Sequence, residues 1–222
     1  MPTTIQQTIT AYQFNELSDK AKDKVREMFY QEIDLSDVQD AFREEMQALG
    51  IYVEDIQYSI ARGQGDGASW TGNVNIIPFL ERLAPDNPMF TKGSMLVELI
   101  RDRWVSHVVC ISRNAYFYNH SGTMRIDNIE HFKDQDHDTH PAVRIRIGIL
   151  QGASVHELFE SIGGEDFLEE VGTAILKDAQ AHANDLYKRL LADYEWYIGD
   201  EHIAECAEIN EWLFDENGKL VN

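Results

Sequence analysis

Residues 51–77 read IYVEDIQYSIARGQGDGASWTGNVNII, and this stretch decides the fold of the chain. Its first ten residues are rich in β-branched and aromatic side chains and contain neither proline nor glycine, which favours a strand. A glycine-rich loop follows at residues 63–67, and residues 68–77 are again typical of a strand. We therefore expect two antiparallel strands joined by this loop.

The chain before this pair predicts one strand and two helices. Residues 8–14 alternate in polarity and favour a strand. Ser18 is a typical N-cap, because apolar residues recur at three-to-four spacing after it. A second helix is expected over residues 35–49, where Gly50 provides a C-terminal stop.

The chain after this pair is less regular at first. Residues 78–92 contain three prolines and are expected to hold one short helix and a loop. Residues 104–112 and 114–120 predict a hairpin, and strict alternation at residues 143–147 predicts a further half-buried strand.

From about residue 165 onward the chain is expected to be helical. One long helix reaches about residue 197, a break follows at Gly199, and a last helix ends at about residue 214. Because the strands are grouped together and the helices lie at the two ends of the chain, the sequence predicts an α+β fold. We expect one domain over residues 1–222, with an antiparallel sheet covered by helices and a helical C-terminal third at about 165–216.

Negative charge is concentrated in this C-terminal third. The formal net charge is -20, and residues 154–222 hold 17 Asp and Glu residues against 4 Lys and Arg residues. Such a field repels nucleic acid and anionic membranes and attracts basic protein surfaces. We therefore expect a protein partner, and neither a direct nucleic-acid partner nor a membrane.

The last helix is predicted to carry an acidic stripe. At about 100° per residue, five acids share roughly a third of its circumference, and apolar residues fall on the opposite side. Together with the preceding Asp200 they are the predicted partner-binding residues: Asp200, Glu201, Glu205, Glu208, Glu211 and Asp215. The residues expected to be buried opposite them are Ile203, Cys206, Ile209 and Leu213. The stripe is either a solvated face that serves solubility or a row of carboxylates offered to a basic groove.

The glycine-rich loop is a second candidate site, with Gln64, Asp66 and Ser69 as its ligand-binding residues. It is either a structural hairpin that uses glycines at positive φ or a ligand-binding loop. It is not a phosphate loop of the usual kind, because a strand rather than a helix follows it. This alternative describes a small-molecule-binding protein or a metal-dependent enzyme.

The weak candidates for metal ligands are Asp134, Asp136, His137 and His140. A calcium loop of the EF-hand type is excluded, because Thr139 stands where such a loop needs glycine and Ile145 where it needs glutamate. The segment is either a solvated acidic loop or a cation site, and we expect no cofactor.

Cys110 and Cys206 are expected to be buried free thiols, since their spacing suits neither a disulfide framework nor a metal pair. The first residues lack the features of a signal peptide, and no apolar run is long enough to span a bilayer. These features predict a cytoplasmic protein, and a homo-oligomer remains open.

Three stretches resemble a family of accessory proteins that is common in tailed phages and prophages. They are the pattern YxFxELSxxAK at residues 12–22, the loop QGDGASWTG at residues 64–72, and the ending at residues 193–220. The resemblance does not extend to residues 78–122. It implies a small accessory protein in a bacterial cytoplasm, and it implies no reaction.

These observations favour a binding protein over an enzyme. The leading hypothesis is an acidic, phage-encoded inhibitor of a host defence protein, which mimics nucleic acid at a basic surface of that protein. The link to host defence is an analogy with other phage accessory genes of this size. A third hypothesis is a virion-associated interaction protein whose acidity serves solubility alone.

Overall fold

The computed structural model describes residues 10–60, 63, 65–101, 108–114, 118–127 and 153–221, apart from the side chains of residues 127 and 153–156. The chain divides into two compact units. Unit 1 combines Met1–Asp37 with Arg189–Asn222, and unit 2 comprises Val38–Lys188. This division does not test the prediction of one domain, which stays a prediction.

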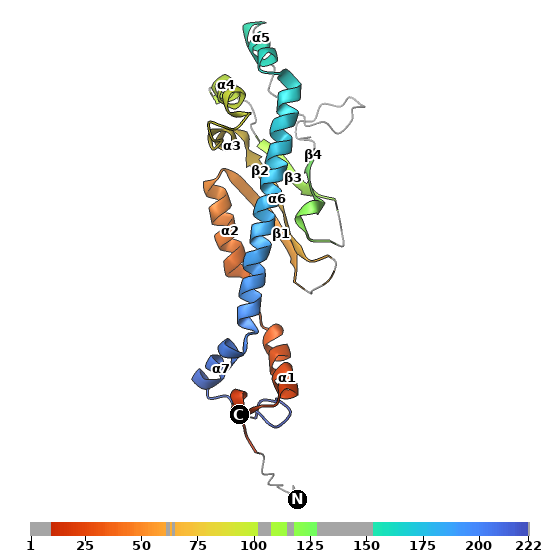
Figure 1. Cartoon of the computed structure of the whole chain (residues 1–222), viewed down its shortest axis with the longest axis vertical. Helices are drawn as coiled ribbons and strands as arrows, with labels where there is room; N and C mark the ends of the chain where they lie inside the picture. Colours follow the sequence, from red (N-terminus) through yellow and green to blue (C-terminus); the bar gives the residue numbers. More distant parts are fainter. Residues whose placement is uncertain are drawn as a thin grey trace, which may run out of the picture. The chain divides into compact units, whose positions relative to one another are not determined.

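Unit 2 contains a four-stranded antiparallel sheet in the part of the chain that the structure describes (Figure 1). The strands follow one another across the sheet in the order β1 (Ile51–Ser59), β2 (Gly67–Asn75), β3 (Val108–Arg113) and β4 (Met124–Asp127). The strand pair predicted within residues 51–77 is confirmed, with Ile51 opposite Val74 and Ser59 opposite Gly67. A register shift between Val53 and Asp55 marks a bulge in β1.

The hairpin predicted from residues 104–112 and 114–120 is wrong in its second strand. β3 pairs with β4, whereas residues 118–123 form a loop and the short 3-10 helix η2 (Ser121–Thr123). The Asn119 side chain accepts a hydrogen bond from Arg113 Nη1 (2.7 Å) and donates one to the Tyr58 carbonyl (3.1 Å). Such side-chain bonds favour loops over strand pairing. The strand predicted at residues 143–147 lies outside the described residues.

Two helices replace the single short helix expected in the proline-containing stretch, namely α3 (Ile76–Glu81) and α4 (Phe90–Arg101). β2 ends at Asn75, two residues before the predicted end of the strand, because Asn75 caps α3. The Asn75 side chain accepts a hydrogen bond from Ile77 N at 3.1 Å. Pro78 lies in the first turn of α3, where the backbone N–H would have no helical partner. The proline therefore does not prevent the helix.

α2 (Ser36–Ala48) confirms the helix predicted over residues 35–49, and it buries Phe42 and Met46. The chain leaves the helix at Gly50, whose φ of +78° is the left-handed conformation that ends many helices. α5 (Ala153–Ser161) is the helix that precedes the long C-terminal helix.

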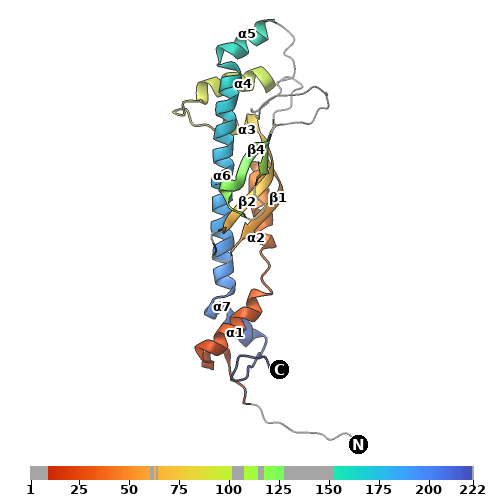
Figure 2. The same ribbon diagram turned by 90° about the vertical axis from the view of Figure 1, so that its right-hand side faces the viewer.

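The long helix α6 (Gly164–Tyr197) confirms the helix predicted from about 165 to about 197. Within unit 2 it lies along one face of the sheet in both views (Figure 1 and Figure 2). Its buried residues in this unit recur at helical spacing: Phe167, Leu168, Val171, Ile175, Ala179, Ala183 and Leu186. The sheet contributes the buried side chains Ile56, Trp70, Val74, Val109 and Ile111. The protein therefore has the predicted α+β fold, an antiparallel sheet covered by helices and followed by a helical C-terminal part.

A charged contact links α6 to α3. Asp178 Oδ2 lies 3.6 Å from His182 Nε2 and 3.2 Å from Arg82 Nη2, and these two neighbours lower the pKa of Asp178 from its usual 3.8. Because the folded-state pKa lies below the unfolded one, the carboxylate stabilises the fold above pH 3.8. That contribution is lost as the pH falls through the lowered value.

We therefore expect Asp178→Asn to reduce the free energy of unfolding at neutral pH by about 0.5 to 1 kcal/mol, the size of a partly exposed ion pair. The difference from the wild type should shrink toward zero as the pH falls below 3.8. Urea titrations at a series of pH values measure this difference, with Glu169→Gln, an exposed acid of the same helix, as the control. A difference that stays constant with pH would contradict the assignment.

Unit 1 is built from η1 (Phe14–Glu16), α1 (Asp19–Tyr30), the end of α6 and α7 (Asp200–Ile209). Ser18 caps α1 as predicted, and its hydroxyl accepts a hydrogen bond from Ala21 N at 3.3 Å. The core of the unit is a cluster of buried apolar residues: Phe14, Leu17, Ala21, Val25, Ile203, Ala207 and Phe214.

The strand predicted over residues 8–14 is wrong for residues 10–14, the part that the structure describes. Tyr12 forms only a single antiparallel bridge with Phe214, and Phe14 already belongs to η1. The Glu16 carboxylate accepts a hydrogen bond from Gln13 N at 2.8 Å and so closes a turn at this point. This local bond ends the extended segment after residue 13.

Candidate functional site

α7 presents three exposed glutamates, Glu201, Glu205 and Glu208, which we call the glutamate row. The helix packs into the core of unit 1 through Ile203 and Ala207 on its other side. No cation of the described residues lies within ion-pair distance of any of the three carboxylates. The row is therefore a set of negative charges without a described counter-ion, on a helix that packs into the core of unit 1.

Asp200, at the start of α7, differs from the row. Its Oδ1 accepts hydrogen bonds from Arg26 Nε (2.9 Å) and Nη2 (2.6 Å), and Lys22 Nζ lies 4.0 Å from Oδ2. The hydrogen bond with Asp200 raises the pKa of Arg26. Asp200 thus attaches α7 to α1, and α1 partly neutralises its charge.

The predicted last helix is five residues too long. α7 ends at Ile209, and Glu211 adopts a left-handed φ of +55°. The Trp212 backbone N–H then donates to the Ala207 carbonyl at 2.8 Å, and Phe214 is fully buried where it pairs with Tyr12. Burial of Phe214 accounts for the early exit from the helix, because a continued helix could not form the Tyr12 bridge.

This early end separates the predicted acidic stripe into parts. Glu211 and Asp215 lie beyond the helix, and Asp215 accepts backbone hydrogen bonds from Lys219 N and Asn217 N, which lower its pKa. The apolar side also differs, because Ile209 is 73% exposed and Leu213 36% exposed, whereas both were expected to be buried.

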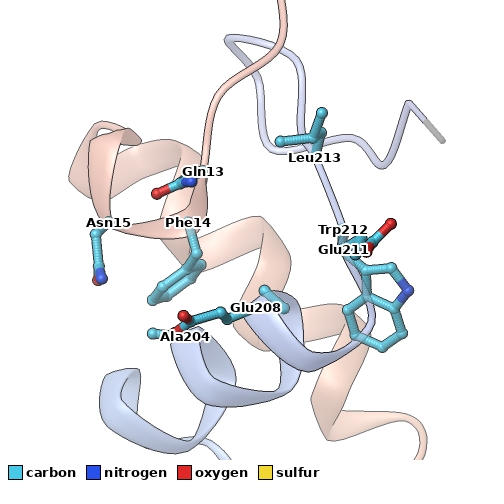
Figure 3. Close-up of a pocket in the computed structure, with 9 residues that line it drawn as sticks. Gln13, Phe14, Asn15, Ala204, Glu208, Glu211, Trp212 and Leu213 are labelled. Carbon is cyan, nitrogen blue, oxygen red and sulfur yellow. The ribbon is translucent and has the colours of Figure 1, made fainter.

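A cavity of about 480 Å³ lies between η1 and α7, and we call it the α7 groove (Figure 3). Figure 3 shows Phe14 of η1 above Ala204 and Glu208 of α7, with Trp212 at the right of the picture. The groove is lined by Gln13, Phe14, Asn15, Ala204, Ala207, Glu208, Glu211, Trp212 and Leu213. It combines two carboxylates and two amides with apolar and aromatic surface, and its lining contains no lysine or arginine.

Aromatic side chains surround His202 of α7, which the sequence analysis did not single out. Trp196 and His202 have ring centroids 3.9 Å apart, Tyr197 meets His202 edge-on at 5.4 Å, and Trp196 is 57% exposed. Exposed tryptophan is enriched in protein interfaces. In the sequence, Trp196 lies in the acid-rich stretch just before the break at Gly199 and within the ending at residues 193–220 that carries the resemblance.

The glycine-rich loop has an internal use for Asp66. Its Oδ1 accepts a hydrogen bond from the Ser59 hydroxyl and its Oδ2 one from Gly63 N, both at 2.9 Å. These bonds close the turn between β1 and β2 and so give Asp66 a structural role. Ser69 is fully buried in β2, and its hydroxyl has no hydrogen-bond partner among the described residues. Gln64 lies outside the described residues.

The structure does not test the predicted metal ligands. Asp134, Asp136, His137 and His140 lie outside the described residues, and no group of acids, histidines and cysteines in the described part could hold a metal ion. Both cysteines are free thiols, half-buried rather than buried as predicted. Cys206 lies 3.5 Å from His202 Nε2, and burial and Glu205 raise the pKa of its thiol, so it is not an activated nucleophile.

No protein-family model matches this chain, and the searches of curated proteins and of solved structures returned no match. None of the helices in the described ranges is long and apolar enough to cross a membrane.

Proposed function

We propose that this protein is an acidic binding protein that inhibits a host protein by occupying the basic surface where that protein holds nucleic acid. The observation that carries the proposal is the glutamate row, three exposed carboxylates without a described cation on a helix fixed to the core of unit 1.

The glutamate row is a linear array of negative charges, and its spacing can be compared with that of nucleic-acid phosphates. Glu201, Glu205 and Glu208 are separated by four and three residues, which a rise of about 1.5 Å per residue converts to roughly 6 and 4.5 Å along the axis. Phosphates follow one another at about 3.4 Å along the axis of one DNA strand. A basic groove shaped for phosphates would thus meet a row of negative charges, spaced more widely along the axis than the phosphates of one strand.

Electrostatic and apolar contacts would have different roles in binding. The carboxylates would steer a basic partner and raise its association rate, an effect that salt weakens. Trp196, near the end of α6, is exposed and contacts His202 of α7, the helix that carries the row. It is therefore a candidate aromatic anchor beside these charges. Large aromatic anchors supply much of the binding energy in many interfaces.

The resemblance to phage accessory proteins supports the choice of partner. A phage protein of this kind would act in the bacterial cytoplasm, and a host defence protein that binds nucleic acid would offer the required basic surface. On this proposal the protein itself binds neither nucleic acid nor membrane, and it performs no reaction.

The test is capture of proteins from a bacterial lysate on the immobilised full-length chain. We expect the wild type to retain nucleic-acid-binding proteins, and excess duplex DNA to release them. Replacing Glu201, Glu205 and Glu208 by Gln should reduce this retention by about tenfold or more, because the charges that face the partner are lost. Raising the salt from about 50 to about 500 mM should have a similar effect.

A matched control removes three exposed acids of unit 2, Glu44, Glu169 and Glu170, by the same substitution to Gln. It changes the net charge equally and should leave retention unchanged. Equal losses in the two variants would indicate a general charge effect, and unchanged retention in the row variant would refute the proposal.

A further inference from the structure

We propose that the α7 groove receives an arginine side chain of the basic partner. This inference rests on the proposed function, and it goes further by naming the residue that the partner inserts and the place where it binds. The α7 groove has a volume of about 480 Å³, which falls in the usual range of ligand-binding clefts.

The lining of the groove selects a cation. Glu208 and Glu211 contribute two carboxylates, and Gln13 and Asn15 add amide oxygens that can accept hydrogen bonds. Since no lysine or arginine belongs to the lining, a phosphate or carboxylate ligand would meet only like charge and weak donors there. A positively charged side chain is the complementary occupant.

The aromatic part of the lining favours arginine over lysine. The planar guanidinium forms paired hydrogen bonds with a carboxylate and stacks on aromatic faces, whereas the ammonium group of lysine is compact and strongly hydrated. Trp212 lines the groove and is held by an edge contact with Phe29, with ring centroids 5.9 Å apart. Phe14 and Ala204 provide apolar surface for the aliphatic stem of an inserted side chain.

The experiment titrates ¹⁵N-labelled full-length protein with three short peptides of the form acetyl-Gly-Leu-X-Gly-amide, where X is arginine, lysine or citrulline. Citrulline keeps the shape of arginine without its charge. We expect the arginine peptide to bind and to shift the indole N–H signal of Trp212. The lysine peptide should bind about fivefold more weakly, and the citrulline peptide at least tenfold more weakly. Equal binding of arginine and citrulline peptides, or shifts confined to other regions, would overturn the proposal.

Two variants test the location. Glu208→Gln should reduce the affinity for the arginine peptide by about tenfold, because a charge-assisted hydrogen bond is lost. Ala204→Leu should weaken it at least as much by filling the groove, and it keeps every charge of the glutamate row. Glu195→Gln, which removes an exposed acid of unit 1 outside the groove, should change binding by less than twofold. Unchanged binding in both groove variants would refute the inference.

The two proposals fail in different ways. If Ala204→Leu retains both the peptide and the captured lysate proteins, the groove inference is wrong and the function proposed for the row stands. If the row variant retains its lysate proteins while Ala204→Leu loses the peptide, the groove binds arginine and the proposed inhibition by the row is wrong.

Discussion

Replacing Gly72 by alanine is expected to destabilise unit 2 by about 3 kcal/mol or more, the combined cost of a strained backbone and an overpacked neighbour. Gly72 has a φ of +153°, and a Cβ atom at this position would lie 1.9 Å from the Tyr52 carbonyl oxygen. That oxygen belongs to the backbone of β1, so no side-chain rotation can relieve the clash. Gly72 is also opposite Val53 at the bulge of β1 and opposite Ile111 in β3, so the strain would fall on both pairings of β2.

Urea denaturation followed by near-ultraviolet circular dichroism measures this effect, because Trp70 lies buried two residues away in the same strand. Gly63→Ala is the matched control, since a Cβ atom there would meet nothing within 4 Å. It should shift the free energy of unfolding by less than about 0.5 kcal/mol. Equal stability of the Gly72→Ala variant and the wild type would show that the close approach of β1 and β2 is not required.

Local patterns predicted the parts of the fold that depend on neighbours in sequence. The strand pair at residues 51–77 is joined by a short loop, and the Ser18 cap lies at the start of its own helix. The buried residues of α6 recur at helical spacing from Phe167 to Leu190. In each case the decisive interactions join residues within a few positions or across one turn. Periodicity and capping chemistry therefore sufficed.

Partners distant in sequence explain the errors. β4 pairs with β3, and residues 118–123 lie between them as a loop and η2. In that loop Asn119 donates a hydrogen bond to the carbonyl of Tyr58, 61 residues away. α7 ends at Ile209 because Phe214 pairs with Tyr12 near the other end of the chain. No spacing within either segment carries this information.

The candidate site shows the same limit. The sequence identified the acids of α7, but it could not indicate that Asp200 is bound by Arg26, 174 residues away, while the glutamate row is not. The α7 groove was also missed, because Gln13, Phe14 and Asn15 meet residues 204–213 only in the folded unit. An amphipathic pattern predicts which side of a helix is exposed. It does not predict which residues from distant parts of the chain lie next to that side.

Replacing Phe214 by alanine is expected to destabilise unit 1 by about 3 to 5 kcal/mol, the usual cost of removing a buried phenylalanine. Phe214 is fully buried and is one of the seven described residues that form the core cluster of this unit. Its backbone also exchanges hydrogen bonds of 2.8 and 2.9 Å with Tyr12, so the cavity would loosen the contact between η1 and the segment after α7.

Hydrogen exchange measured by mass spectrometry separates this effect from a global one. In Phe214→Ala we expect faster exchange in α1 and α7, while β1 and β2 keep their protection, because these strands belong to the separately packed unit 2. Ile209→Ala is the control, since Ile209 is 73% exposed and its truncation should cost less than about 0.5 kcal/mol. Since the glutamate row depends on α7, Phe214→Ala should also lose capture of basic proteins, and retention of both protection and capture would contradict the role given to the Phe214 contact.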